Sequence, residues 1–137
     1  MDGRAKILVV DDERVVREGC LRVLNSKGYE EVTTAENGLQ AMESLAEKPV
    51  DIILLDLKMP VMSGEEVLER LRTLHPDIPV IIITGHGTVD TAVECMKKGA
   101  YDFITKPFQL DQFLLISTGP MKREGWSKRP DYSKMRI

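Results

Sequence analysis

The chain has 137 residues, a length that favours a single domain with a core large enough to fold without disulfide or metal staples. Hydrophobic residues make up 42% and charged residues 30% of the sequence, a balance that excludes intrinsic disorder over the whole length. No apolar run approaches the roughly 20 residues that a membrane-spanning helix needs, so we expect no membrane association.

The net charge of −3 is unevenly distributed along the chain. Residues 118–137 carry six basic and two acidic side chains, whereas the rest of the chain holds 13 basic and 20 acidic ones. This acidic body argues against direct nucleic-acid binding by the chain. Cys20 and Cys95 match no metal-binding or redox spacing and no signal peptide is visible, so we expect a cytoplasmic protein.

Short apolar runs alternate with amphipathic segments along the chain. Runs of branched residues are typical of strands buried on both faces, and apolar residues spaced three or four apart are typical of helices. In chain order the pattern predicts a strand at 7–10, a helix ended by Gly28, a strand at 31–34, a helix ended before Pro49, a strand at 52–55, a helix ended before Pro76, a strand at 80–83, a helix ended by Gly99, a strand at 101–104 and a helix at 109–116. This alternation predicts a doubly wound α/β domain with right-handed crossovers.

Each of the first four predicted helices has an apolar face that should contact the core. These faces comprise Val16, Cys20, Val23 and Leu24; Leu39, Met42, Leu45 and Ala46; Val67, Leu68, Leu71 and Leu74; and Val89, Ala92, Val93 and Met96. The fifth helix is short because Gly119-Pro120 prevents its continuation. We therefore expect one domain over residues 1–117, followed at 118–137 by a basic tail that is not an independent domain.

Polar residues follow four of the predicted strands. Asp11-Asp12 come after the first strand and Asp56 after the third, while Thr84 follows the fourth and Lys106 the fifth. In open α/β sheets, ligands bind outside the carboxyl ends of the strands, at one shared edge. Three carboxylates, one hydroxyl and one ammonium group should therefore converge there.

The chemistry of such a set points to metal-assisted phosphoryl transfer. Three neighbouring carboxylates need a cation between them, and oxygen ligands with open water positions suit Mg²⁺. Lys106 and Thr84 could then hold the oxygens of an incoming phosphoryl group. Asp56 ends the central strand and is the best candidate for a nucleophile, which would become an aspartyl phosphate.

Each residue taken singly also has a plain structural interpretation. Asp11-Asp12 could form an acidic helix start, and Asp56 could cap a loop. Thr84 before Gly85 fits ordinary turn chemistry, and Lys106 could be a solvated surface lysine. Their joint placement at four strand ends favours a functional site over these separate explanations.

Several segments resemble the receiver domain of bacterial two-component response regulators. They are Leu8-Val9-Val10-Asp11-Asp12-Glu13, Asp56-Leu57-Lys58-Met59-Pro60 with Gly64, Thr84-Gly85, and Lys106-Pro107-Phe108. The resemblance covers about residues 5–116, and Thr84-Gly85-His86-Gly87 is most similar to receivers of nitrogen-regulation-type transcription activators. It implies a flavodoxin-like fold with one five-stranded parallel sheet in the order 2-1-3-4-5. Helices on both faces of this sheet would give three α/β/α layers.

The resemblance also implies how the acidic residues act. Asp56 would accept a phosphoryl group from the phosphohistidine of a sensor histidine kinase. Asp12, Asp56 and the backbone carbonyl of Lys58 would bind Mg²⁺ directly, with Asp11 acting mainly through water.

Three more residues receive roles from the same resemblance. Lys106 would pair with the phosphoryl group, and Thr84 would contact it and move with it. Phe103 matches the aromatic residue that turns inward when Thr84 shifts. Since Phe103 alternates with Tyr101 and Ile104 in a short strand, simple core packing is an open alternative for this residue.

The leading hypothesis is a phospho-accepting signalling switch, not an enzyme, with only self-catalysed phosphorylation and dephosphorylation of its aspartate. One alternative is a stand-alone phosphatase or phosphotransferase with an Asp nucleophile, but such enzymes often carry a second Asp where this chain has Lys58. Another is a flavin-binding module, which would need a phosphate-binding loop in place of Asp11-Asp12-Glu13. Because the fifth helix is short, we expect a monomer or a dimer insensitive to phosphate.

Overall fold

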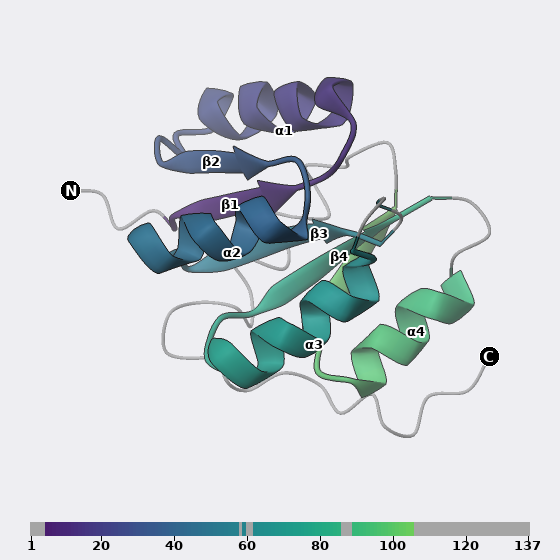
Figure 1. Ribbon diagram of the computed structural model, residues 1–137. Helices are drawn as coiled ribbons and strands as arrows, with labels where there is room; N and C mark the ends of the chain where they lie inside the picture. Colours follow the sequence, from purple (N-terminus) through teal and green to yellow (C-terminus); the bar gives the residue numbers. More distant parts are fainter. Residues whose placement is uncertain (1–4, 58, 60–61, 86–88, 106–137) are drawn as a thin grey trace.

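Strands and helices alternate through the part of the chain that the computed structural model describes, residues 5–57, 59, 62–85 and 89–105 (Figure 1). In order, the elements are β1 (Ile7–Val10), α1 (Arg14–Ser26), β2 (Val32–Ala35), α2 (Gly38–Glu47), β3 (Ile52–Asp56), α3 (Gly64–Leu74), β4 (Val80–Thr84), α4 (Val89–Lys97) and β5 (Asp102–Thr105). The predicted helix at 109–116 and the tail at 118–137 lie outside the described residues. Within those residues, no helix has the length and apolar character needed to cross a membrane.

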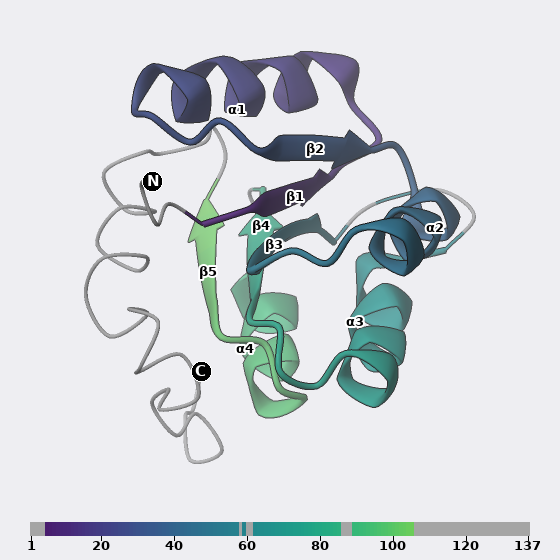
Figure 2. The same ribbon diagram turned by 90° about the vertical axis from the view of Figure 1, so that its left-hand side faces the viewer.

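The five strands form one parallel sheet in the order β2-β1-β3-β4-β5, which confirms the predicted fold class. Ile7 pairs with Val32 on one side and with Ile52 on the other, and Ile53 pairs with Val80. Figure 2 shows the twist between β2 at one edge and β5 at the other. Because every strand runs the same way, the carboxyl ends meet at one edge.

Alternate side chains of the sheet build two apolar clusters, one on each face. Leu8 and Val10 belong to the cluster under α2, α3 and α4, whereas Ile7 and Val9 belong to the cluster that contains Cys20 of α1. The residues of β1 are fully buried, as expected for a strand covered on both sides. Helices on both faces give the three layers expected from the sequence (Figure 1).

Local signals determine where several helices begin and end. The side chains of Asn37 and Ser63 accept hydrogen bonds from backbone N–H groups in the first turns of α2 and α3. Gly28 and Gly99 follow α1 and α4 with φ angles of 95° and 114°, a left-handed conformation that favours glycine. These two glycines end their helices as predicted.

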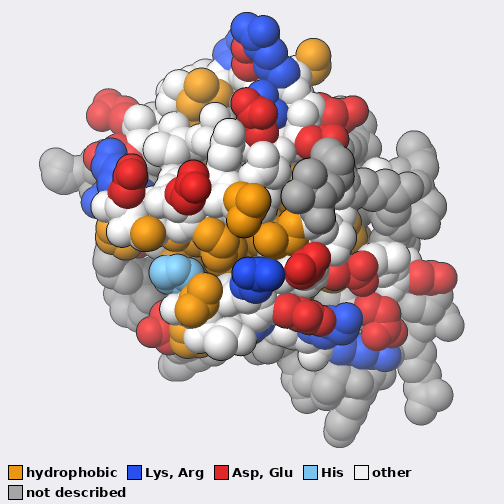
Figure 3. Space-filling model, in the orientation of Figure 1, with side chains coloured by type: hydrophobic (Ala, Val, Ile, Leu, Met, Phe, Trp, Pro, Cys, Tyr) orange, Lys and Arg blue, Asp and Glu red, His pale blue; other side chains and the backbone are white. Residues whose placement is uncertain are grey.

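The predicted apolar face of α2 is partly wrong. Leu39 is 54% exposed and Ala46 is exposed, whereas Gly38 and Ala41 are buried. A Cβ atom on Gly38 would lie 2.6 Å from Val67 Cγ2, so α2 approaches α3 closely at Gly38, and the neighbouring Leu39 is on the solvent side. Figure 3 shows the resulting gathering of hydrophobic side chains on the surface over α2 and its border with α3.

Smaller differences affect the element ends. Leu74, predicted to face the core, is 62% exposed because it is the last residue of α3. β2 and β5 begin one residue later than predicted, and β3 and β4 extend one residue further. In β3 and β4 the backbone ladder continues past the apolar run, since Asp56 pairs with Ile83 and Thr84 with Thr105.

Candidate functional site

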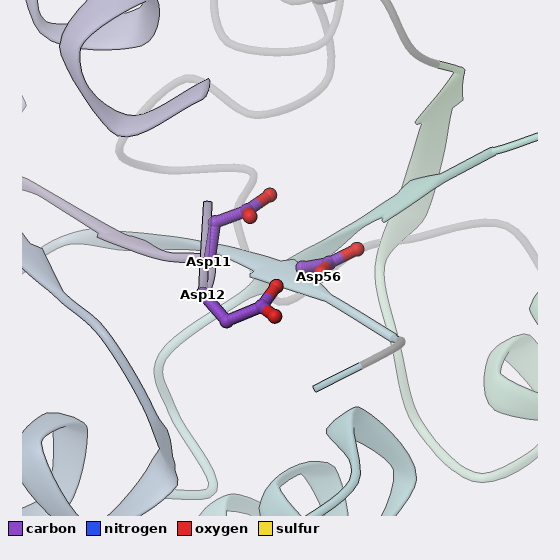
Figure 4. Close-up of side chains that lie close together, drawn as sticks. All are labelled: Asp11, Asp12 and Asp56. Carbon is purple, nitrogen blue, oxygen red and sulfur yellow. The ribbon is translucent and has the colours of Figure 1, made fainter. Parts of the chain in front are cut away.

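Acidic side chains meet where β1 and β3 end. These strands are neighbours, and Val10 pairs with Leu55, so the next residues, Asp11 and Asp56, come side by side at the carboxyl edge of the sheet. Asp12 follows in the turn to α1. Figure 4 shows the three carboxylates gathered at this point, two from the β1 end and one from β3. The structure thus brings together the three carboxylates that the sequence placed at one edge.

The carboxylates are close together and unequally exposed. One oxygen from each of Asp11, Asp12 and Asp56 lies within 4.8 Å of the other two. Asp11 is 0% and Asp56 is 3% exposed, whereas Asp12 is exposed. At this separation two negative charges repel by about 1 kcal/mol in water, and by about 3 kcal/mol at an effective dielectric constant near 20.

The donor set fits a hard divalent cation. Carboxylate oxygens are the ligands that Mg²⁺ and Ca²⁺ prefer, and a cation between them would offset their repulsion. Two buried ligands and one exposed ligand leave room on the solvent side for water, which Mg²⁺ usually retains. The cluster can therefore hold a cation whose open positions face solvent.

Several hydrogen bonds position the turn after β1. The Asp11 N–H donates to the Ala35 carbonyl at 3.1 Å, and the Glu13 N–H donates to Asp11 Oδ1 at 2.8 Å. The Arg17 guanidinium donates through Nη1 to the backbone carbonyl of Asp11 at 2.8 Å. The sequence patterns do not single out Arg17, and its place six residues after Asp11 is the one signal that they offer for it.

The segment after Asp56 packs closely against the start of α3. The Gly64 N–H donates to the Leu57 carbonyl at 2.9 Å. A Cβ atom on Gly64 would lie 2.6 Å from Leu57 Cα and would also collide with the backbone carbonyl of Asp56. Glycine at this position therefore lets α3 begin directly against the backbone that carries Asp56.

The other predicted site residues are only partly placed. Thr84 is the last residue of β4, one position beyond the partner of Asp56 in the register, so its backbone lies at the same edge. Phe103 in β5 is partly buried and packs against the cluster under α2, α3 and α4, which fits the core-packing alternative; the switch role stays a prediction. Lys58 and Lys106 lie outside the described residues.

Away from this edge, burial is the main cause of the pKa shifts of two groups. Burial raises the pKa of Asp102, the first residue of β5, although a hydrogen bond from the Phe103 N–H acts in the opposite direction. Burial and the nearby charge of Glu65 raise the pKa of the Cys95 thiol to about 11, so this thiol is protonated at neutral pH. Neither group belongs to the acidic cluster.

Comparison with known families and curated proteins gives one consistent result. Residues 7–117 match the model of the response regulator receiver domain. The chain is 40% identical over 113 residues to the DNA-binding transcriptional regulator NtrC of Escherichia coli, and 43% identical over 112 residues to an NtrX-like response regulator of Rickettsia bellii. These alignments cover 82% and 80% of this chain but 24% and 23% of the relatives. The chain thus spans about a quarter of the length of these relatives.

Solved structures agree with the sequence comparison. A response regulator receiver domain protein from Clostridium thermocellum superposes with a TM-score of 0.82 at 32% identity, covering 90% of this chain and 99% of that one. The receiver domain of NtrX from Brucella abortus superposes with a TM-score of 0.78 at 35% identity, covering 82% and 95%. Together with the matched residues and the acidic cluster at the sheet edge, these findings establish that the chain belongs to the response regulator receiver domain family.

Proposed function

We propose that this receiver domain serves phosphorelay signalling by accepting a phosphoryl group on Asp56 from the phosphohistidine of a sensor histidine kinase. The observation that carries the proposal is the buried position of Asp56 at the end of the central strand, within 4.8 Å of two other carboxylates. A carboxylate held at a strand end by the sheet is a positioned nucleophile.

The transfer is a simple displacement at phosphorus. A carboxylate oxygen of Asp56 forms the new O–P bond while the N–P bond of the phosphohistidine breaks. The electron pair of that bond stays on the imidazole, which takes up a proton from solvent. The product is an aspartyl phosphate, with no net oxidation or reduction.

Other residues of the site would support this step. Asp11, Asp12, Asp56 and the backbone carbonyl of Lys58 would hold Mg²⁺, which when bound neutralises negative charge on the phosphoryl group. The hydroxyl of Thr84 and the ammonium group of Lys106 would then bind phosphoryl oxygens.

The chain acts in this proposal as a switch whose only catalysis concerns its own aspartate. Thr84 would shift toward the phosphoryl group, and Phe103 would follow by turning inward, which passes the change to an output partner or domain. The relatives are regulators, and their names give no support to the alternative of a stand-alone phosphatase. Although NtrC is a DNA-binding regulator, we propose that this acidic receiver does not itself contact DNA.

Phosphorylation by a small donor tests the assignment of Asp56. With acetyl phosphate and Mg²⁺, intact-mass analysis should show one added phosphoryl group that hydroxylamine removes, as expected for an acyl phosphate. Asp56→Asn should abolish the addition, and omission of Mg²⁺ should suppress it. Asp77→Asn is the matched control, because Asp77 is exposed in the turn before β4, at the opposite end of that strand from Thr84. Equal labelling of Asp56→Asn and the parent would refute the proposal.

We further propose that the chain is a monomer, or a dimer that does not respond to phosphate. This proposal rests on the short predicted helix at 109–116, which would offer little surface for contact between two copies of the chain. Light scattering before and after treatment with beryllofluoride, a phosphoryl mimic, tests this statement. A shift from monomer to dimer that persists after deletion of residues 118–137 would contradict it.

A further inference from the structure

We infer that Arg17 is a positioning residue for the acidic cluster and that it acts by holding the peptide group between Asp11 and Asp12. Its Nη1 atom donates to the backbone carbonyl of Asp11 at 2.8 Å, in a partly buried contact. The inference rests on the proposed function, since it concerns how well the cluster binds Mg²⁺.

The contact links α1 back to the end of β1. The hydrogen bond from the Arg17 N–H to the Glu13 carbonyl, at 3.0 Å, belongs to the first turn of α1, so the carbonyl of Asp11 lies ahead of the helix. Helical hydrogen bonding therefore does not orient this carbonyl. The side chain of Arg17 supplies an anchor from within the helix instead.

Anchoring this carbonyl constrains Asp12 more than Asp11. A peptide group is planar, so the direction of the Asp11 carbonyl also sets the direction of the bond from the Asp12 nitrogen to its Cα. Asp11 is already held by the bonds to Ala35 and Glu13, and it is fully buried. Asp12 is exposed, so little packing orients its carboxylate, and the backbone becomes its main source of order.

Arginine suits this task because its guanidinium presents several donors in a rigid plane. Its stem also lines a hollow beside β2 with Leu21 and Thr34, so truncation to alanine would remove packing as well as the hydrogen bond. Arg17→Met keeps an unbranched apolar stem and removes the donors. Arg17→Lys keeps the charge and one donor site.

The same helix provides a matched control. The guanidinium of Arg14 binds Glu18 at 2.8 Å, and its side chain is 80% exposed. Arg14→Met removes a positive charge from the first turn of α1 without removing the hydrogen bond to Asp11. A difference between the two variants therefore reports the hydrogen bond and not the helix charge.

The test is a Mg²⁺ titration of the full chain in which the melting temperature is measured at each Mg²⁺ concentration. A ligand raises stability according to its concentration relative to Kd, so the titration separates Mg²⁺ affinity from stability without metal. We expect Arg17→Met to raise the Kd for Mg²⁺ about tenfold, as groups that orient metal ligands typically do. Arg14→Met should leave this Kd unchanged, and Arg17→Lys should fall between Arg17→Met and the parent.

Three results would overturn the inference. One is an Arg17→Met variant with a lower melting temperature but the Mg²⁺ affinity of the parent, which would make Arg17 merely structural. A second is tighter Mg²⁺ binding by Arg17→Met, the effect of charge removal alone. If Arg17→Met does not fold, Arg17→Leu, which also lacks the donors, is measured in its place, and an unchanged Mg²⁺ affinity of that variant is the third. A parent that does not respond to Mg²⁺ would instead refute the proposed function, and this outcome appears before any variant is compared.

Discussion

Replacing Gly64 by alanine should weaken the fold and slow phosphorylation together. The new Cβ would lie 2.6 Å from Leu57 Cα and would collide with the carbonyl of Asp56. Both partners are backbone atoms of the segment that carries Asp56, the proposed phosphoryl acceptor, so no side-chain rotation can relieve the contact. Either α3 or the end of β3 has to move.

The size of the effect follows from these contacts. Added atoms in a well-packed region typically cost about 1 to 3 kcal/mol, and alanine returns less than about 1 kcal/mol through its helix propensity. We therefore expect Gly64→Ala to lower the free energy of unfolding by about 1 to 2 kcal/mol, or the melting temperature by roughly 3 to 10 °C. Gly19→Ala is the control, because Gly19 lies within α1 and an added Cβ there would have no atom of another element within 4 Å. It should stabilise the chain by about 0.5 to 1 kcal/mol.

Urea unfolding of both variants measures the stability change, and the initial rate of labelling by acetyl phosphate at saturating Mg²⁺ measures the effect on the site. Gly64→Ala should label more slowly than the parent even under conditions where it is fully folded, whereas Gly19→Ala should match the parent. A Gly64→Ala variant as stable and as fast as Gly19→Ala would show that the end of β3 tolerates displacement, and the reasoning would be refuted.

Three further experiments test other parts of the molecule. Asp12→Ala should abolish Mg²⁺ binding but raise the melting temperature in metal-free buffer, because it removes a repulsion of about 1 kcal/mol with each of the other two carboxylates; a fall in melting temperature would contradict the repulsion. Cys95 should resist iodoacetamide at pH 8 in the folded chain, because its buried thiol has a pKa of about 11, and should react after unfolding, as mass spectrometry can show. Burial raises the pKa of Asp102 above its usual 3.8, so the folded state favours the protonated carboxyl group. The stability that this preference contributes is present at low pH and is lost as pH rises through the folded-state pKa. Asp102→Asn should therefore have little effect on urea unfolding near pH 4 and should stabilise the chain at pH 7; equal effects at both pH values would count against the shift.

The strands and the acidic cluster could be predicted from the sequence because both depend on simple, local patterns. A strand buried on both faces needs only a run of apolar residues, as in β1 and β3. Once those strands are parallel neighbours, the residues that follow them share an edge, so Asp11 and Asp56 meet without any further information. The carboxylate cluster therefore follows from topology.

The packing of α2 and the role of Arg17 could not be predicted in this way. In α2, apolar residues occupy more than one side, so their spacing does not determine which side is buried. The close approach of Gly38 to Val67 decides it, and that contact joins residues far apart in the sequence. Similarly, Arg14 and Arg17 are both arginines near the start of α1, and the sequence alone does not distinguish them. Only the folded turn shows that Arg17 contacts the Asp11 carbonyl while Arg14 contacts Glu18.

The unequal exposure of the three carboxylates has a consequence for the speed of ion exchange. Asp11 and Asp56 lie at strand ends inside the core, while Asp12 lies on the solvent side. An ion can therefore enter and leave past Asp12 while β1 and β3 stay paired. Opening of core strands is the rarest and slowest local motion of a domain, whereas exposed side chains rearrange within nanoseconds. Occupancy of the cluster can thus follow the ion concentration in solution, and the amide hydrogens of Val10 and Leu55 can remain protected from exchange throughout.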